Sequence, residues 1–250
     1  MPSLKPLSAA CALRSEIGMR SRNDDAAFAR VFEKGPWLGI FAVADGVSGH
    51  LGGGEAAALA IGRVAGAARE IAAAPATDPA RAARDTVAGA ILDIAAMKRS
   101  HPMKKHAGTT FTMLIVHDDR GYIYHAGDSR LYRRRDGLWM QLTEDHTVGW
   151  RLVGEGALRL EDYPQSPMRK RLYRYLGKTG ALVARSTFAI LPGDEFLLAT
   201  DGCFDRNGIL PIPALPFGGY DAAATIDALF ASRELAGHED NATAVYAVVR

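Results

Sequence analysis

Residues 37–46 read WLGIFAVADG. Residues 37–44 form a continuous apolar run, and Asp45-Gly46 closes it. A short apolar run that is bounded by a turn signal is typical of a strand buried on both faces. We therefore expect a buried strand over 37–44 with an aspartate at its end.

Two helices are predicted after this strand, over 52–74 and about 80–99, because apolar residues recur there at helical spacing. A proline at position 102 fits a stop just beyond the second helix. The buried faces are expected to carry Ile61, Val64, Ala68 and Ile71 in the first helix, and Val87, Ile91 and Ile94 in the second.

Most of the remaining chain is predicted to form strands. Asp136-Gly137 separates two of them and indicates a tight hairpin. One further helix is expected at about 220–234, and residues 1–13 are interpreted as a first strand in preference to a short secretion signal. Consecutive hairpins and paired helices favour an α+β fold with antiparallel sheets. The predicted strands are 109–116, 122–126, 131–135, 138–142, 182–190, 195–200 and 242–249.

Composition excludes several classes of protein. The chain has 250 residues, 48% of them hydrophobic, and a net charge of +2, so no strong field directs it to nucleic acid or to a membrane surface. Its apolar runs are shorter than the roughly 18 residues that a membrane span needs. Cys11 and Cys203 form no CxxC pair, which argues against a zinc site or a disulfide framework. We expect one domain over 1–250 in the cytoplasm.

Aspartates recur where strands begin or end. Asp45 and Asp201 each follow an apolar run and precede glycine, Asp128 follows a third run, and Asp240 precedes the last strand. A single Asp-Gly is usually only a turn, but gathered carboxylates repel one another and are costly to bury. A hard divalent cation resolves that cost, and oxygen ligands favour magnesium, manganese or calcium over zinc. The sequence therefore predicts an acidic metal site.

Seven short motifs occur in the order found in the metal-dependent protein phosphatases of type 2C, and the chain resembles the bacterial serine/threonine branch of that family along nearly its whole length. Each motif is weak by itself, and the order carries the resemblance. The motifs are RSRNDD (20–25), ADGVSGH with GE (44–50 and 54–55), GTT (108–110), GDSRLY (127–132), LTEDHT (142–147), TDG (200–202) and DNAT (240–243).

The resemblance implies a four-layer sandwich in which helices flank two antiparallel β-sheets, and it assigns roles to individual residues. Asp45 would bridge two metals with the Gly46 carbonyl beside it, and Asp201 and Asp240 would bind the first metal. Further roles are implied for Asp25, which would hold metal-bound waters, for Asp128, which would join Asp201 at a third site, and for Arg20, which would grip the substrate phosphate.

The implied reaction is hydrolysis of phosphoserine and phosphothreonine in proteins. Two or three Mn²⁺ or Mg²⁺ ions would activate a water, and the metals with Arg20 would offset the charge on the phosphoryl oxygens. No nucleophilic side chain is then required. We expect a monomer that acts on phosphorylated proteins alongside a cognate serine/threonine kinase, with no nucleic-acid or membrane partner.

Some positions depart from the family pattern or allow two interpretations. Val47 stands where eukaryotic members carry a candidate acid histidine, so His50 is interpreted as structural, and Asp24 stands where the family has glutamate. Residues 148–174 correspond to the family's flap, and their basic residues could dock a phosphopeptide or belong to a solvated loop. The basic run at 130–135 is either a sheet surface or a steering patch.

Two alternative functions use the same fold. A pseudophosphatase would bind partners without turnover, and it predicts loss of metal ligands, whereas Asp45, Asp201 and Asp240 are all present. A two-metal enzyme acting on a phosphodiester would use the same carboxylates. Only the family motifs favour a protein phosphatase over that second alternative.

Overall fold

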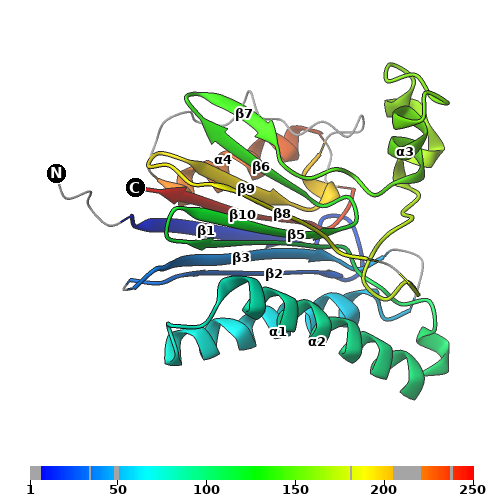
Figure 1. Ribbon diagram of the computed structural model, residues 1–250. Coiled ribbons are helices and arrows are strands. Elements are labelled where there is room, and N and C mark those ends of the chain that lie inside the picture. The colour runs from blue at the N-terminus through cyan, green and yellow to red at the C-terminus, as the bar shows by residue number, and fades with distance from the viewer. Residues whose placement is uncertain (1–6, 34, 48–50, 181, 205–220, 237–238) are drawn as a thin grey trace.

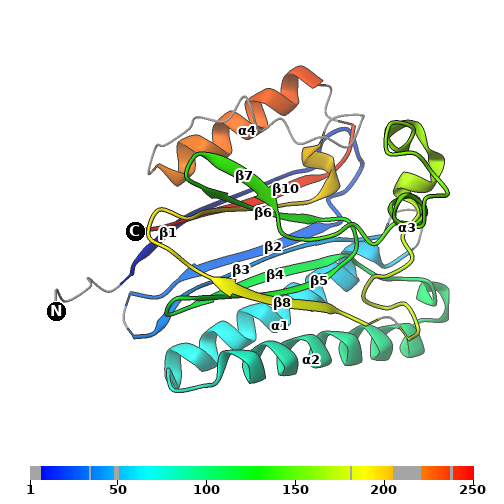
Figure 2. The ribbon, with the colours of Figure 1, turned by 45° about the horizontal axis from the view of Figure 1, so that its top comes forward.

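The computed structural model describes residues 7–33, 35–47, 51–180, 182–204, 221–236 and 239–250. Two five-stranded antiparallel sheets lie face to face, and helices cover their outer sides (Figures 1 and 2). Sheet A has the order β1 (Ala9–Glu16), β10 (Ala242–Val249), β9 (Glu195–Ala199), β6 (Arg130–Arg135) and β7 (Leu138–Gln141). Sheet B has the order β2 (Asp25–Val31), β3 (Trp37–Asp45), β4 (Phe111–His117), β5 (Arg120–Ala126) and β8 (Ala184–Ala189).

The helices complete a four-layer α/β/β/α arrangement. Helices α1 (Gly53–Ala73) and α2 (Pro79–Ser100) cover sheet B, and α4 (Ala222–Ala236) covers sheet A, whereas α3 (Val148–Gly154) stands at one end of the sandwich (Figure 1). None of the helices in the described part of the chain is both long and apolar enough to cross a bilayer. The short 3₁₀ turns are η1 (Pro102–Lys104), η2 (Tyr163–Gln165), η3 (Pro167–Lys170) and η4 (Asp201–Cys203).

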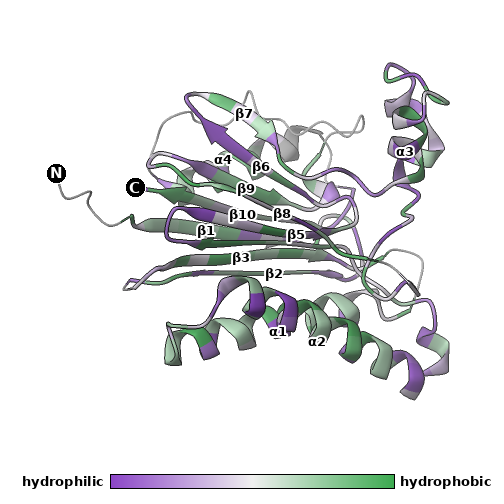
Figure 3. Cartoon of the chain, viewed as in Figure 1, coloured by the Kyte–Doolittle hydropathy of each residue, from purple (hydrophilic) through white to green (hydrophobic). Residues whose placement is uncertain are grey.

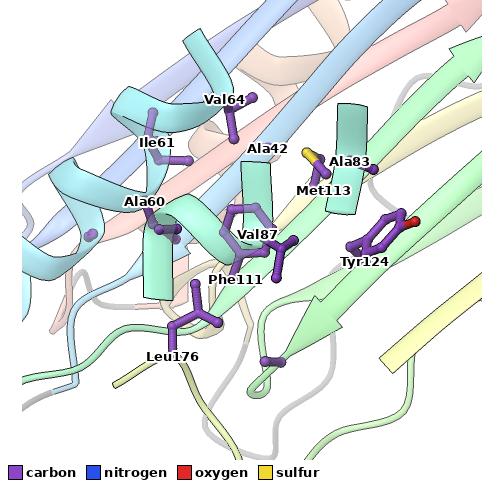
Figure 4. Close-up of a cluster of buried hydrophobic side chains, with 14 of the residues drawn as sticks. Ala42, Ala60, Ile61, Val64, Ala83, Val87, Phe111, Met113, Tyr124 and Leu176 are labelled. Atoms are coloured by element: carbon purple, nitrogen blue, oxygen red, sulfur yellow. The ribbon is translucent and has the colours of Figure 1, made fainter. Parts of the chain in front are cut away.

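Three hydrophobic clusters hold the layers together, and the alternation of side chains along the strands builds them. In β4, Phe111 and Met113 face α1 and α2, whereas Leu114 and Val116 face sheet A. Figure 4 shows the first of these clusters, between the helices and sheet B. The third cluster lies between α4 and sheet A. Burial on both faces explains why the central strands are almost wholly hydrophobic (Figure 3).

The predicted fold class and the predicted elements are confirmed. The run at 37–44 is β3 and is fully buried as far as Ala44. Asp136 and Gly137 both have positive φ, as a tight hairpin turn requires. The first strand begins at Ala9, and residues 1–6 lie outside the described part of the chain.

The predicted buried face of the second helix is wrong at Ile91, whose surface is 38% exposed. The buried stripe of α2 contains Ala83, Val87, Ala90 and Ile94. Ile91 follows Ala90 directly, and one residue turns the side chain about 100° around a helix axis, away from the sheet.

The basic run of β6 is mainly structural, although it colours part of the strand hydrophilic (Figure 3). Arg130 binds Asp145 through two hydrogen bonds of 2.8 and 2.6 Å. Arg134 pairs with Glu195, and Arg135 pairs with Asp194. Three of its arginines are therefore committed to carboxylates of this protein, which argues against the interpretation of the run as a steering patch.

The Arg130–Asp145 pair is nearly buried, with side-chain exposures of 11% and 5%. Replacing Asp145 by alanine leaves the guanidinium buried without its partner, so Asp145→Ala should lower the free energy of unfolding by about 3–5 kcal/mol. Urea denaturation would measure this loss. The control is Glu155→Ala, which removes the partner of exposed Arg151 and should cost less than about 1 kcal/mol. Equal losses in the two variants would contradict a buried structural pair.

Candidate active site

An acidic pocket of about 350 Å³ opens at one edge of the sandwich, where strands of both sheets end. Sheet B brings Asp45 from the end of β3 and Asp128 from the turn after β5. Sheet A brings Asp201 from the turn after β9 and Asp240 from the start of β10. The pocket is lined by these four aspartates and by Arg20, Val47, Thr110, Lys170, Arg171, Leu172 and Tyr175.

Hydroxyl groups hold the backbone of Asp45 in place. The Asp45 N–H donates to Thr110 Oγ1 at 2.9 Å, and its carbonyl accepts from Thr110 N at 2.8 Å and from Thr109 Oγ1 at 2.9 Å. Thr110 Oγ1 is also hydrogen-bonded to Ser129 Oγ at 2.6 Å, beside Asp128. The hydroxyl groups of the GTT and GDS motifs therefore fix the position of Asp45 relative to Asp128.

Two glycines permit close approaches that the pocket needs. A Cβ on Gly202 would lie 1.8 Å from the carbonyl oxygen of Asn241, which brings the Asp201 turn against the start of β10. A Cβ on Gly46 would lie 2.4 Å from the backbone of Gly53, in the first turn of α1. These contacts exclude any side chain at either position, and the predicted role of the Gly46 carbonyl as a ligand stays a prediction.

Asp25 lies directly opposite Asp45 in the β2–β3 register. Its Oδ2 accepts a hydrogen bond from Thr200 Oγ1 at 2.9 Å. Its Oδ1 is shielded from solvent and has no hydrogen-bond partner within the described ranges. An unpartnered carboxylate oxygen beside other carboxylates is costly unless a cation or a water reaches it, so this atom supports the predicted role near a metal.

Burial and mutual repulsion disfavour the ionised form of these aspartates. Burial, with the Asp25 carboxylate next in effect, raises the pKa of Asp45 well above its ordinary value. Burial likewise raises the pKa of Asp128, with Asp201 adding to it, and raises that of Asp25 to about 7. Asp201 also has a raised pKa, mainly through burial, although the nearby Lys170 ammonium acts to lower it. A divalent cation would reverse this balance and keep the carboxylates ionised.

The donor set fits Mg²⁺ or Mn²⁺, because carboxylate oxygens converge and neither sulfur nor imidazole lines the pocket. Across the described ranges, no three His, Cys, Asp or Glu side chains form a group that could by itself hold a metal ion. Mg²⁺ is usually bound through one or two carboxylates and keeps several water ligands. The residues present would thus supply part of each coordination sphere, and water the rest.

Arg20 is held at the rim of the pocket by an ion pair and by a clamped loop. Its Nη2 donates to Asp240 Oδ2 at 2.8 Å, and its side chain remains 49% exposed. The side chain of Asn241 donates to the carbonyls of Ile17 and Arg22 and accepts from Asp24 N–H. Asn241 therefore ties the loop that carries Arg20 to β10. Asn241 lies in the DNAT motif, but the sequence alone predicts no role for it.

Asp24 is turned away from the acidic pocket. Its Oδ2 accepts from Arg22 Nε at 2.8 Å, and it lines a separate pocket with Arg22 and Leu51. The structure brings the predicted residues Arg20, Asp45, Asp128, Asp201 and Asp240 together, with Asp25 adjoining Asp45. His50 lies outside the described residues.

The histidine of the LTEDHT motif is structural. His146 is buried and stacks on His125 with ring centroids 4.7 Å apart. Burial lowers the pKa of His146 to about 3 and that of His125 to about 4, so both rings are neutral near pH 7. Asp145 of the same motif binds Arg130, as described above, so neither residue acts as a ligand of the pocket.

Basic residues of the segment 148–174 also line the pocket. Lys170 ends η3, and Arg171 and Leu172 follow it into the pocket lining. Of the two interpretations of this segment, contact with the pocket is the one that the structure supports for Lys170 and Arg171. Lys170 and Arg171 reach the pocket because the chain turns back after α3, and no local sequence pattern indicates that turn.

The sandwich and its acidic edge are those of the metal-dependent phosphatase class that the motifs resemble. A family model described as Protein phosphatase 2C matches residues 14–217, and the chain belongs to that family. The serine/threonine protein phosphatase PstP of Mycobacterium tuberculosis is 32% identical over 78% of this chain, which spans about a third (36%) of the length of PstP. The serine/threonine phosphatase stp of Listeria monocytogenes is 30% identical over 74% of this chain and 73% of its own.

A solved structure gives the same result for the fold. The catalytic domain of PstP in complex with two manganese ions superposes with a TM-score of 0.83 and 27% identity, covering 97% of this chain and 99% of that one. The predicted family and four-layer fold are thereby confirmed.

The raised pKa values predict how stability depends on pH without metal. An unfolded histidine has an ordinary pKa of 6.5, so above about pH 7.5 the two buried histidines are almost wholly neutral whether the chain is folded or unfolded, and they contribute little to the pH dependence. At this pH the unfolded chain has released the protons of its aspartates, whose ordinary pKa is 3.8, whereas the folded protein still holds some of them. The free energy of unfolding in EDTA should therefore fall from about pH 7.5 to about pH 8.5.

Melting temperatures in EDTA would measure this fall, and added Mn²⁺ should raise stability more at the higher pH because protons compete less for the carboxylates. The Asp45→Asn variant lacks one of these carboxylates and should show a shallower dependence. A rise in stability across this pH range in EDTA would contradict the proposed repulsion.

Proposed function

We propose that this protein hydrolyses phosphoserine and phosphothreonine in proteins, using two or three Mn²⁺ or Mg²⁺ ions in the acidic pocket. The convergence of Asp45, Asp128, Asp201 and Asp240 from two sheets on one pocket, beside Arg20 and Lys170, carries the proposal. Membership of the protein phosphatase 2C family and the two manganese ions of the PstP structure support it.

The chain's residues divide into two groups by charge. Asp45, with the Gly46 carbonyl, would bridge two ions, and Asp201 and Asp240 would hold the first of them. Asp25 would anchor coordinated waters, and Asp128 would share a third ion with Asp201. When bound, the ions would lower the pKa of water and draw charge from the phosphoryl group.

Arg20 and Lys170 would bind the substrate phosphoryl group from the rim of the pocket. The ion pair with Asp240 orients the Arg20 guanidinium, and its remaining N–H groups can donate to two phosphoryl oxygens at once. Lys170 adds a second positive charge to the pocket lining, near Asp201. Together they would hold the phosphorus in line for attack by water and offset the charge that develops in the transition state.

The partners follow from the proposed reaction and stay predictions. Phosphorylated proteins would be the substrates, and a serine/threonine kinase would supply them. The free thiols of Cys11 and Cys203 are compatible with the predicted cytoplasmic location. A catalytically silent protein is disfavoured, because the carboxylates that turnover requires converge on one pocket.

Turnover of a phosphothreonine peptide tests the proposal. We expect phosphate release with Mn²⁺ or Mg²⁺, none in EDTA, and a loss of at least about 100-fold in kcat for Asp45→Asn, because one oxygen ligand of the shared position is gone. Asp136→Asn, at the distant hairpin turn, is the control. Bis(4-nitrophenyl) phosphate should be a poor substrate; its preferential hydrolysis would favour the phosphodiester alternative.

Lys170 supplies a second prediction. Lys170→Ala should raise KM for the phosphopeptide by about tenfold, because a charge-assisted contact with the phosphoryl group is lost. The Mn²⁺ concentration that gives half-maximal activity should stay the same or fall, because the Lys170 ammonium repels a metal ion bound beside Asp201. Lys105→Ala is the control. An unchanged KM, or weaker Mn²⁺ activation, would contradict the assigned role.

A further inference from the structure

A second pocket, of about 320 Å³, lies between the first turns of α2 and the outer edge of sheet B. Its lining consists of Ala80, Arg84, Tyr122, Tyr124, Arg185, Ser186 and Thr187. It is rich in hydrogen-bond donors and includes no carboxylate. We call it the Arg84–Arg185 pocket.

Strand register builds one wall of this pocket. In the β5–β8 ladder, Tyr124 lies directly opposite Arg185 and Tyr122 lies directly opposite Thr187, so these four side chains share one face of sheet B. Strand β8 is the last strand of the sheet, and Arg185 on it is exposed.

Helix α2 supplies the opposite wall. Ala80 and Arg84 are one helical turn apart and face the same side. The Tyr124 hydroxyl donates to the Ala80 carbonyl over 3.4 Å. This hydrogen bond is long and weak, so the Tyr124 hydroxyl can instead bond to a ligand in the pocket. Figure 4 shows Tyr124 at the margin of the hydrophobic cluster, with its hydroxyl directed away from Val87 and Phe111.

The two arginines of this pocket differ from the arginines that bind carboxylates of the protein itself. Arg63, Arg130 and Arg135 each bind a carboxylate at 2.7 Å or less. By contrast, Arg185 has no carboxylate partner in the part of the chain that is described, and Arg84 approaches Asp78 only to 4.0 Å. The Asp78 carboxylate already caps α2 by accepting from Ala80 and Arg81 N–H groups.

The positive charges act on the same point in the pocket. Burial raises the pKa of Tyr124, and Arg84 and Arg185 act to lower it, because each guanidinium lies close enough to favour a negative charge at the tyrosine oxygen, whereas Asp78 and Tyr122 have smaller effects in the opposite direction. A net positive pocket with hydroxyl donors and no internal carboxylate is suited to an anion with several acceptor oxygens.

We propose that the Arg84–Arg185 pocket binds a phosphoryl group. Two planar guanidinium groups can each donate two parallel hydrogen bonds to phosphoryl oxygens, and the tyrosine and threonine hydroxyls can satisfy the remaining acceptors. Arginine clusters of this kind recognise phosphorylated segments of proteins. The phosphoryl group belongs either to a phosphorylated side chain or to inorganic phosphate, which present the same oxygens.

This site is distinct from the acidic pocket. The two pockets share no lining residue. A phosphoryl group bound between Arg84 and Arg185 therefore lies outside the acidic pocket, and the proposal does not depend on turnover.

Titration of the metal-free protein with inorganic phosphate, at constant ionic strength and in EDTA, tests the proposal by NMR. The Nε–H signals of Arg84 and Arg185 and the amide signal of Thr187 should shift together and saturate. In the Arg84→Ala/Arg185→Ala variant the apparent Kd at Thr187 should rise by about tenfold or more. Arg81→Ala is the matched control, because Arg81 lies on the same helix, is exposed and pairs with Asp85.

A phosphoserine peptide and its unphosphorylated form separate the two sources of the phosphoryl group. Tighter binding of the phosphopeptide than of phosphate identifies a phosphorylated chain as the ligand, and equal binding identifies phosphate. Absence of saturable shifts with both probes, or equal Kd values in the double variant and in Arg81→Ala, would overturn the proposal. If the double variant fails to fold, Arg185→Gln, which keeps most of the aliphatic stem, replaces it.

Discussion

The repulsion among aspartates gathered at one edge of the sandwich is the constraint on which the rest of the site depends. Burial and the neighbouring carboxylates raise the pKa of Asp25 and Asp45, so without a cation these carboxyl groups favour the protonated form. Rigid surroundings are needed to hold such groups together. Threonine and serine hydroxyls, two glycines without room for a Cβ, and the clamp of Asn241 provide that rigidity.

The four-layer fold serves this purpose because its two sheets are packed into one unit. The cluster between them includes Phe41, Leu114 and Val245, all at most 1% exposed. Asp45 and Asp128 therefore keep a constant relation to Asp201 and Asp240, although the pairs belong to different sheets. A metal site made from one sheet alone would lack half of these carboxylates.

The distribution of arginines separates structure from recognition. Arg130 and Arg135 bind carboxylates of the protein itself and stabilise sheet A. Arg20 and Lys170 face the acidic pocket, and Arg84 and Arg185 face a pocket without acidic residues. Sequence clusters do not reveal this difference: the densest basic run, at 130–135, is mostly paired, whereas Arg84 and Arg185 lie far apart in the chain.

Local patterns in the sequence determined the strands, the helices and the strand-end aspartates, because backbone propensity, side-chain alternation and turn chemistry act over a few residues. Ordered motifs likewise indicated the family, and they predict a metal-binding role for Asp45, Asp201 and Asp240. Only the tertiary structure decided that Asn241 clamps the Arg20 loop, that Lys170 lies near Asp201, that Ile91 faces outward and that Arg185 and Arg84 line one pocket. These contacts join residues distant in sequence or depend on how elements pack, and the register and rotation that create them are set by burial of the whole core.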